Sequence, residues 1–303
     1  MRIAPCPGLR QPARAMTDPR RPVPPPSDDT PSTPAAKPPA RTGRPRKTPA
    51  EEPAGGSAVV DRALAILDAL AARDGLPLSD IARQLGLAPS TTHRLLGALA
   101  ARRLVEADPA TQGWSIGPGA VRLGAAFLRR GGLAERARPA LDRLAAESGE
   151  TAALAVPDAD AALVVAEAAG PATLRVVLAP GTRLPLHASA AGKALIAHLP
   201  LARVEALLGA GPLPALTPQS LTDQGALTAD LATLRHAGWL SERDESVPGQ
   251  SAVAAPVFAG LGDPVAALTL AGPSLRLDAR RIEALGPTIA AAAAALGAAL
   301  GGR

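Results

Sequence analysis

The stretch "LSDIARQLGLAPSTTHRLLGALAARRLVE", residues 78–106, has the pattern of two helices joined by a tight turn. The first part is short and ends at Gly86, and Pro89 stands where proline suits the first turn of a second helix. After the second helix, "RRLVEAD" and "QGWSIG" have the residue types of a small β-hairpin. Because an amphipathic helix precedes the stretch, the order of these elements predicts a winged helix-turn-helix.

The preceding helix is predicted from "SAVVDRALAILDALAARDG", residues 57–75. Its apolar residues recur at intervals of three and four, which places them on one face of a helix. We expect that face to consist of Val60, Leu64, Leu67 and Leu70. Gly75 is expected to end the helix.

The helix from Pro89 is predicted to have two different sides. Its inward stripe is expected to comprise Thr92, Leu95, Leu96 and Leu99, and its outward side Ser90, His93, Arg94 and Gly97. Short polar side chains at the start of a recognition helix let the backbone approach base edges in the major groove, and Arg94 also suits phosphates. The predicted DNA-contacting residues of this region are Ser79, Ser90, Thr91, Thr92, His93, Arg94, Arg102 and Arg103.

Each of these features also has a plainer interpretation. The Ser-Thr-Thr sequence is a common helix start, and Arg94 is a residue type that often belongs to a solvated surface. Trp114 and Ile116 in the hairpin are expected to pack the wing onto the core. The order of all the pieces within about 60 residues is what favours DNA binding.

Residues 1–56 differ in composition from the rest of the chain. They hold 15 of the 33 prolines, ten Lys/Arg and five Asp/Glu, and therefore carry the whole formal net charge of +5. A segment with so little apolar surface is predicted to be disordered, with polyproline II character. Within it "RTGRPRK" resembles an AT-hook, whose arginines, here Arg44 and Arg46, would enter the minor groove of A·T-rich DNA. The alternative to the AT-hook is a solvated basic linker. A separate alternative is a translation start at Met16, which would leave residues 1–15 out of the protein.

Length, cysteine content and hydropathy limit the class of protein. The 303 residues allow about two domains. Cys6 is the single cysteine, and the first residues lack the apolar region of a secretory signal, so a cytoplasmic location is expected. The alanine-rich end of the chain is expected to form a packed helix rather than a membrane anchor. Residues 57–118 hold six Lys/Arg and six Asp/Glu, a balance that is unusual for a DNA-binding module.

The second half alternates helix-like and strand-like segments in an irregular order. Helices are predicted over residues 118–131, 133–149, 188–199, 202–210 and 224–238, and from a cap at Asp278 to the end of the chain. Strands are predicted over residues 151–157, 161–168, 173–181, 239–245, 251–258 and 264–272. This irregular order favours an α+β fold over a doubly wound parallel sheet.

With these elements in place, the chain resembles the IclR-type bacterial transcriptional regulators. The matching segments are "RALAILDAL", "LSDIARQLGLAPSTTHRLLGALAARRLVE", "WSIGPGAVRLG", "LPLHASAAGKALIAHLP" and "SVPGQSAVAAPVFAGLGDPVAALTLAGPSLRL", which occur in the family's order over residues 57–300. The resemblance implies a C-terminal effector-binding domain with a GAF-like α/β sheet, a linking helix, and assembly as dimers or dimers of dimers.

The resemblance also implies a position for the effector pocket, on the sheet face beneath the loop "LPLHASAAGKA" and beside the segment before "AVAAPV". By position it nominates Ser189, Ala190, Gly192, Glu245, Gly249 and Ser251. Arg175, Arg183 or Lys193 would pair with a carboxylate; the alternative is that Arg183 and Lys193 are solvated and that Gly192 only allows close packing. Family members that bind aromatic acids often have an arginine where Ser251 stands in this sequence. A small aliphatic acid or a neutral ligand is therefore expected at least as strongly as an aromatic acid.

Enzyme and metal sites are not indicated by the sequence. The pair Gly192-Lys193 fails as a phosphate-binding loop, because His187 and Ala194 stand where that loop needs glycine and Ser/Thr. Four scattered histidines and one cysteine offer no zinc spacing, and no nucleophile elbow is present. We therefore expect no enzymatic activity, no metal and no cofactor.

The sequence as a whole predicts four segments. They are a Pro-rich basic tail (residues 1–56), a winged helix-turn-helix DNA-binding domain (57–118), a linker helix (119–132) and an effector-binding domain (133–303). The expected partners are double-stranded DNA, a small-molecule effector such as an organic acid, and further copies of the chain in a homodimer or homotetramer, with no membrane. The alternative is an architectural DNA-binding protein whose C-terminal domain only oligomerises and binds no ligand.

Overall fold

The computed structural model describes residues 55–129, 132–209, 211–260 and 262–301. The predicted AT-hook residues Arg44 and Arg46 lie outside this range. The first described element is a helix that begins at Gly55, two residues before the predicted start of the winged domain.

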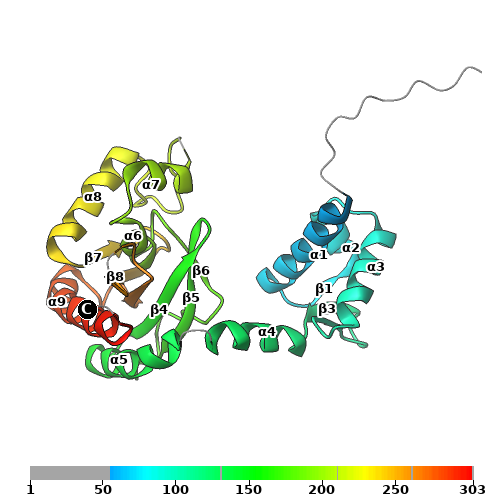
Figure 1. Cartoon of the computed structure of the whole chain (residues 1–303), viewed down its shortest axis with the longest axis horizontal. Helices are drawn as coiled ribbons and strands as arrows, with labels where there is room; N and C mark the ends of the chain where they lie inside the picture. The colour runs from blue at the N-terminus through cyan, green and yellow to red at the C-terminus, as the bar shows by residue number, and fades with distance from the viewer. Residues whose placement is uncertain (1–54, 130–131, 210, 261, 302–303) are drawn as a thin grey trace, which may run out of the picture. The chain divides into compact units, whose positions relative to one another are not determined.

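Residues 55–116 form three helices and a small sheet (Figure 1). The elements are α1 (Gly55–Ala72), β1 (Leu76–Pro77), α2 (Leu78–Gln84), α3 (Pro89–Ala100), β2 (Val105–Ala107) and β3 (Gly113–Ile116). The strands pair antiparallel in the order β1-β3-β2, so that β2 and β3 form the predicted hairpin. This arrangement confirms the winged helix-turn-helix.

The core of this unit is built from the second half of α1 and from β1, α2, α3 and β2. Its buried apolar residues are Ile66, Leu70, Leu76, Ile81, Leu96, Leu99 and Val105, with Trp114 and Ile116 packed against them. Val60 and Leu64, on the predicted apolar face in the first half of α1, lie outside this core, since they are 56% and 53% exposed. Helical spacing alone identifies an apolar face, but it does not say how far along the helix the core extends.

A linker helix, α4 (Pro118–Arg129), follows the wing, and none of its residues is buried. It is separated by Gly132, which has a left-handed φ of 62°, from α5 (Leu133–Ser148). The described part of the predicted linker helix, residues 119–132, ends at Arg129, and residues 130–131 lie outside the described range.

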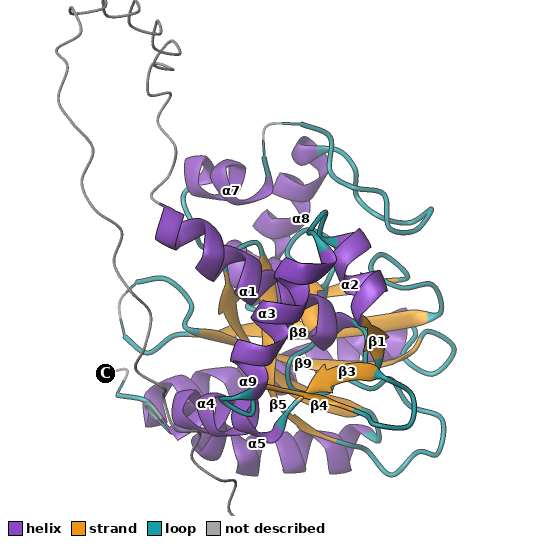
Figure 2. Ribbon diagram, turned by 90° about the vertical axis from the view of Figure 1, so that its right-hand side faces the viewer, coloured by secondary structure: helices purple, strands orange, loops and turns teal. Residues whose placement is uncertain are grey.

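The rest of the chain is a six-stranded antiparallel sheet with helices on both faces (Figures 1 and 2). The strands are β4 (Thr151–Asp158), β5 (Ala161–Ala168), β6 (Arg183–Pro185), β7 (Leu240–Arg243), β8 (Gln250–Val257) and β9 (Ala266–Pro273), in the order β6-β5-β4-β9-β8-β7. The remaining helices are α6 (Ala190–Ile196), α7 (Leu201–Leu208), α8 (Gln224–Ala237) and α9 (Ala279–Ala299). The predicted α+β class is thus confirmed.

The two faces of the sheet bury side chains of different size. The face toward α5 and α9 carries larger residues such as Leu154, Val253 and Leu268. The face toward α6, α7 and α8 is mostly alanine in the centre of the sheet, at positions 153, 155, 252, 254, 267 and 271. Because alanine side chains are short, α6 can lie close to the sheet on that face.

The strand predicted over residues 173–181 is absent, and the short strand β6 pairs with β5 instead. Several backbone groups of the predicted strand bond to side chains rather than to a neighbouring strand. The carbonyl of Val176 accepts from Thr151 Oγ1 at 2.5 Å, and the amide of Leu178 donates to Glu167 Oε2 at 3.1 Å. A β-like composition does not determine pairing when such partners compete for the backbone.

The C-terminal helix α9 is, within the described residues, the one helix long and apolar enough to cross a membrane. One side of it is buried against the sheet and α5, through Ile282, Leu285, Ile289 and Leu296 among others. Its N-cap is Asp278, whose carboxylate accepts from the amide of Arg281 at 2.8 Å, as the sequence predicts. The helix is therefore a core element of the fold, as expected for the alanine-rich end.

Candidate functional site

The start of α3 presents short polar side chains to solvent. Ser90, His93 and Arg94 are exposed, Thr91 is half-buried, and Gly97 adds an open position in the middle of the same side. No side chain caps the helix, so its first backbone amides are left for an outside acceptor. This is the surface that a recognition helix needs in order to approach base edges and phosphates.

Thr92 does not belong to this surface. Its side chain is fully buried, and its Oγ1 donates to the carbonyl of Ala88 at 3.2 Å. It was predicted both as a DNA contact and as part of the inward stripe, and the structure supports only the second. Successive side chains of a helix point about 100° apart, so Thr92 points into the core although its neighbour Thr91 is half-exposed.

The basic pair after α3 lies in an exposed turn that is joined to the linker helix. Arg102 and Arg103 are both exposed, and Arg103 has a left-handed φ of 59°. The carbonyl of Arg103 accepts from the amide of Gly119 at 2.7 Å. A Cβ on Gly119 would lie 2.5 Å from that oxygen, so the start of α4 packs against this turn as only glycine allows. Ser79 is exposed in the first turn of α2, which begins at Leu78.

The balanced charge of the winged domain separates by element. The segment from α3 through the following turn, residues 89–103, contains three arginines and no Asp or Glu, whereas residues 104–121 contain Glu106 and Asp108 and no Lys or Arg. The carboxylate of Asp108 accepts from Ala110 N and Thr111 Oγ1, both at 2.8 Å, and these hydrogen bonds lower the pKa of Asp108. The recognition helix and the turn that follows it are therefore basic together, and the wing is acidic.

In the second domain, the loop before α6 is folded tightly against the helix. Ser189 is the N-cap of α6; its Oγ accepts from Gly192 N at 3.0 Å and donates to Pro185 O at 2.6 Å. A Cβ on Gly192 would lie 2.4 Å from Pro185 O, and Ala190 is 1% exposed. Gly192 thus allows close packing, and the hydroxyl of Ser189 is used by the fold.

Lys193 is fully buried and paired with two carboxylates. Its Nζ lies 2.7 Å from Asp230 Oδ2 on α8, and 2.8 and 2.7 Å from the two carboxylate oxygens of Glu245. Burial raises the pKa of Glu245 although Lys193 opposes the shift. The alternative interpretation, in which Lys193 is solvated, was wrong, while Arg183 is an exposed residue paired with Asp158 and Asp160.

The connection between β7 and β8, residues 244–249, is held by side-chain hydrogen bonds. Asp244 Oδ1 accepts from Gly249 N and from Ser274 Oγ, both at 2.7 Å. Ser251 is fully buried, and its Oγ donates to Ser274 Oγ at 3.0 Å. Gly249 has a φ of 79°, a conformation that favours glycine.

Glu242 on β7 is a buried carboxyl that sequence analysis missed. It is 1% exposed; its Oε2 accepts from Glu245 N at 3.0 Å and its Oε1 from Ser246 Oγ at 2.9 Å. Burial raises the pKa of Glu242 to about 7, against the opposing effect of these hydrogen bonds. The alternation of β7, in which Leu240 also points inward, was the signal that could have found it.

Comparison with known protein families assigns both the helix-turn-helix domain and the C-terminal domain. Residues 59–109 match the family described as the IclR helix-turn-helix domain, and residues 125–298 match the bacterial transcriptional regulator IclR C-terminal family. The chain belongs to the IclR family. It is a DNA-binding transcriptional regulator with a C-terminal effector-binding domain, as the resemblance implied.

Individual IclR-family proteins support this assignment over most of the chain. The HTH-type transcriptional regulator BhcR of Paracoccus denitrificans is 43% identical over 256 residues, covering 84% of this chain and 92% of BhcR. The HTH-type transcriptional repressor AllR of Escherichia coli is 34% identical, covering 86% and 96%. A crystal structure of an IclR regulator from Alicyclobacillus acidocaldarius superposes with a TM-score of 0.72 at 26% identity, covering 81% and 99%.

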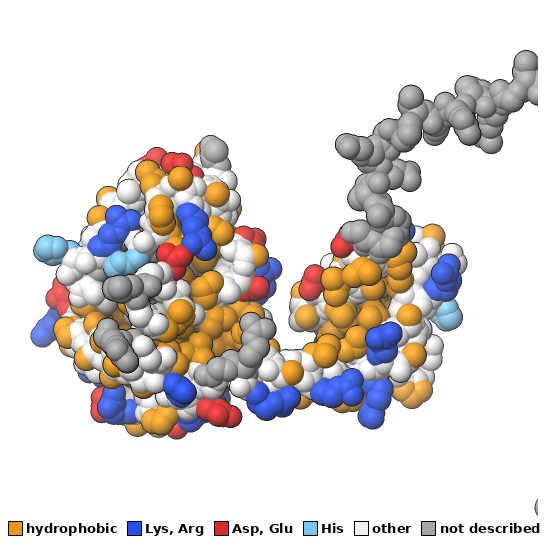
Figure 3. Space-filling model, viewed as in Figure 1, with side chains coloured by type: hydrophobic (Ala, Val, Ile, Leu, Met, Phe, Trp, Pro, Cys, Tyr) orange, Lys and Arg blue, Asp and Glu red, His pale blue; other side chains and the backbone are white. Residues whose placement is uncertain are grey.

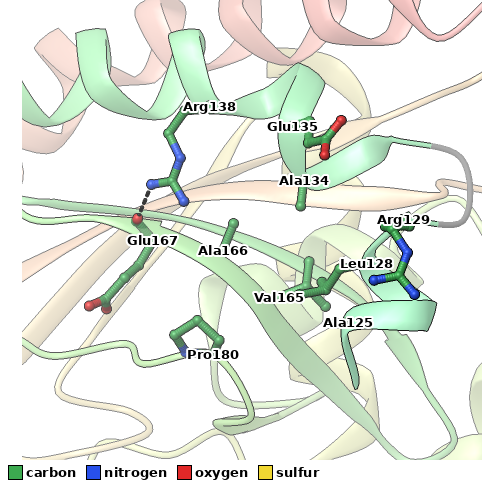
Figure 4. Close-up of a pocket in the computed structure, with 10 residues that line it drawn as sticks. All are labelled: Ala125, Leu128, Arg129, Ala134, Glu135, Arg138, Val165, Ala166, Glu167 and Pro180. Carbon is green, nitrogen blue, oxygen red and sulfur yellow. Dashed lines mark hydrogen bonds between the residues drawn. The ribbon is translucent and has the colours of Figure 1, made fainter. Parts of the chain in front are cut away.

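The residues nominated for the IclR-type effector pocket are close to one another only in part. Lys193 forms an ion pair with Glu245, and this pair connects the 244–249 loop to α6, the helix that Ser189 caps. Gly249 stands at the C-terminal end of the same loop, and Ser251 follows it on β8. None of the six lines either of two open cavities, of 460 Å³ beside Leu184–His187 and of 730 Å³ beside β5 (Figure 4). The described residues contain no cluster of three or more His, Cys, Asp or Glu that could hold a metal.

Proposed function

We propose that this chain regulates transcription by binding an operator as a homodimer, through the exposed start of α3, and that a small effector at the α6 side of the sheet modulates this binding. The observation that carries the proposal is the basic, acid-free surface of residues 89–103. Ser90, Thr91, His93 and Arg94 would approach base edges. Ser79, Arg102 and Arg103 would hold the phosphates.

Dimer formation is supported by the apolar residues that the single chain leaves in solvent. On α1, Val59, Val60 and Leu64 are 51–56% exposed, and on α4, Leu123 and Phe127 are 58% and 50% exposed. Figure 3 shows hydrophobic side chains gathered over α1. A 12-residue helix with no buried residue, such as α4, is marginal in water, so its apolar face needs a partner. A second copy would place two recognition helices about one DNA turn, ~34 Å, apart.

For the effector, we propose a small aliphatic acid or a neutral molecule of similar size. Because α6 lies close to the alanine face of the sheet, and because Ala190 and Gly192 are tightly packed, a ligand on this side would have to be small. Ser189, Ala190, Gly192, Glu245, Gly249 and Ser251 remain the nominated positions, with Glu242 added to them. Because these groups are already bonded to one another, a ligand would have to open the residue 244–249 loop.

The segment boundaries complete the proposal. We place the DNA-binding domain at residues 57–118, the linker helix at 119–132 and the effector-binding domain at 133–303. We propose that the protein acts in the cytoplasm and has no catalytic activity. Effector binding would act on the recognition helix through α4, whose start is bonded to the Arg103 turn. The coupling is limited to the difference in effector affinity between the two arrangements of the dimer.

The basic tail, residues 1–56, would add affinity through Arg44 and Arg46 in a flanking minor groove. A test is a footprint on the DNA upstream of the chain's own gene, with and without these residues, over a range of salt concentrations. We expect paired half-sites to be protected by both forms, with a smaller salt slope when the tail is deleted. Diffuse, strongly salt-dependent binding that vanishes with the tail would instead favour the architectural alternative.

A further inference from the structure

A cavity of 730 Å³ lies where the end of α4 meets α5 and β5, away from the nominated effector residues (Figure 4). Its volume is in the range of small-molecule sites in proteins. The residues that line it are Ala125, Leu128, Arg129, Ala134, Glu135, Arg138, Val165, Ala166, Glu167 and Pro180. No step of the proposed function uses this cavity.

The floor of the cavity is apolar. Val165 and Ala166 of β5 are 7% and 3% exposed, and Leu128 and Pro180 face them from α4 and from the segment before β6. Such a surface binds the hydrocarbon part of a ligand through the hydrophobic effect.

One guanidinium at the rim is available to a ligand. Within the described residues Arg129 has no hydrogen bond or ion pair, whereas Arg138 Nη1 donates to the carbonyl of Glu167 at 2.7 Å. The carboxylate of Glu167 accepts from Leu178 N, and that of Glu135 points away from the floor in Figure 4. Among the described residues, the lining of the cavity therefore combines an apolar floor with two guanidinium groups that have no ion pair, and of these Arg129 also has no hydrogen bond.

The linker helix can line this cavity with one side and contact a second copy of the chain with the other. At 100° per residue, Ala125 and Leu128 fall on one side of α4, and Leu123 and Phe127 fall on the opposite side. A second copy that covers Leu123 and Phe127 would therefore leave the cavity side of the helix open.

We infer that this cavity is a second small-molecule site, which takes an apolar monocarboxylate with its carboxylate on Arg129 and its hydrocarbon chain on the floor. Charge-assisted hydrogen bonds from a guanidinium to a carboxylate supply the orientation. A ligand here touches both the linker helix and the effector-binding domain. It would therefore stabilise one arrangement of α4 independently of the effector at α6.

The experiment is calorimetric titration of the full chain with octanoate and with 1-octanol, in the absence of DNA. We expect saturable binding of one octanoate per chain, weakened about tenfold by Arg129→Gln. The matched control is Arg122→Gln, on the same side of α4 two turns earlier and outside the cavity, which should leave octanoate binding unchanged. Octanol should bind the wild-type chain and Arg129→Gln equally, and Leu128→Asp should weaken both ligands.

Two results would overturn the inference. One is the absence of saturable octanoate binding, as expected if another copy of the chain fills the cavity. The other is an equal effect of Arg129→Gln and Arg122→Gln on octanoate binding. Because the titration contains no DNA, and because the two substituted arginines lie on α4 rather than beside α6, neither result bears on the proposed regulation of the operator.

Discussion

At the scale of single residues, neighbouring hydroxyls on α3 have opposite roles. Ser90 is exposed at the start of the helix, while Thr92 is fully buried and bonded to the carbonyl of Ala88. The sequence "PSTTHR" contains both, and residue type alone does not separate them. Their positions relative to Leu96 and Leu99 do, because the buried stripe has helical period.

Substitutions at these two residues test the assignment. Thr92→Val keeps the shape of a buried side chain, so we expect operator affinity to stay within about twofold and stability to change by about 1 kcal/mol, the value of one hydrogen bond. Ser90→Ala should leave unfolding unchanged and weaken operator binding severalfold. Fluorescence anisotropy and urea unfolding measure the two effects. A loss of DNA affinity in Thr92→Val equal to that in Ser90→Ala would contradict the assignment.

Glu242 makes stability depend on pH in a direction opposite to that of a salt-bridged carboxylate. Its pKa in the folded chain is raised to about 7, above the ordinary value of 4.5, so the folded state keeps a proton that the unfolded state loses. The free energy of unfolding should therefore fall as pH rises from about 4.5 to 7 and then level off, at ~1.4 kcal/mol per unit of pKa shift as an upper limit.

The variant Glu242→Gln should remove this part of the pH dependence. Urea unfolding at pH 5 and pH 8 should show a smaller difference between the two pH values for the variant than for the wild-type chain. Gln keeps an acceptor for Ser246 Oγ, so the fold should persist. An unchanged pH dependence would show that Glu242 is already ionised in the folded chain at pH 5.

At the scale of elements, the wing and the recognition helix differ in charge. Glu106 is exposed on β2, and no hydrogen bond or ion pair holds it in the described structure. Since phosphates repel it, we expect Glu106→Gln to raise DNA affinity by about twofold to fivefold at low salt and less at high salt. Anisotropy at two salt concentrations measures this. A decrease in affinity would mean that the carboxylate of Glu106 accepts from a base.

In the dimer that we propose, the linker helix α4 is the element whose stability depends most on a partner. Replacing both Leu123 and Phe127 with Glu should dissociate the dimer and weaken operator binding at least tenfold, because two half-sites are no longer bound together. Sedimentation velocity measures the dissociation. Leu275→Glu, at a site 97% exposed in the turn between β9 and α9, is the control. Dimers that persist in the double variant would place the interface elsewhere.

Element boundaries show what local sequence can and cannot predict. The strands at residues 151–158 and 161–168 match their predicted positions, since continuous apolar runs end in turn residues. The segment 173–181 has a similar composition but no strand, because Thr151, Glu167 and Arg276 bond to its backbone from other parts of the fold. Those partners are distant in the sequence and follow no local period.

At the scale of the whole molecule, the order of motifs was sufficient to predict the α+β fold and the family. The effector site was harder to predict, because family position nominates residues but says nothing of their bonds. Lys193 shows this clearly: its burial depends on Asp230 and Glu245, which come from α8 and from the connection after β7. Such a triad becomes visible only when the tertiary structure brings the three elements together.

The measurement that tests the central claim most directly is quantitative footprinting of the upstream DNA by the wild-type chain, Arg94→Ala and Arg280→Ala. Arg280 is exposed on α9 and carries the same charge, so it controls for net charge. We predict that Arg94→Ala costs about 1–3 kcal/mol of binding and relaxes sequence preference within each half-site, while Arg280→Ala binds like the wild type. Equal protection by all three proteins would contradict recognition through α3.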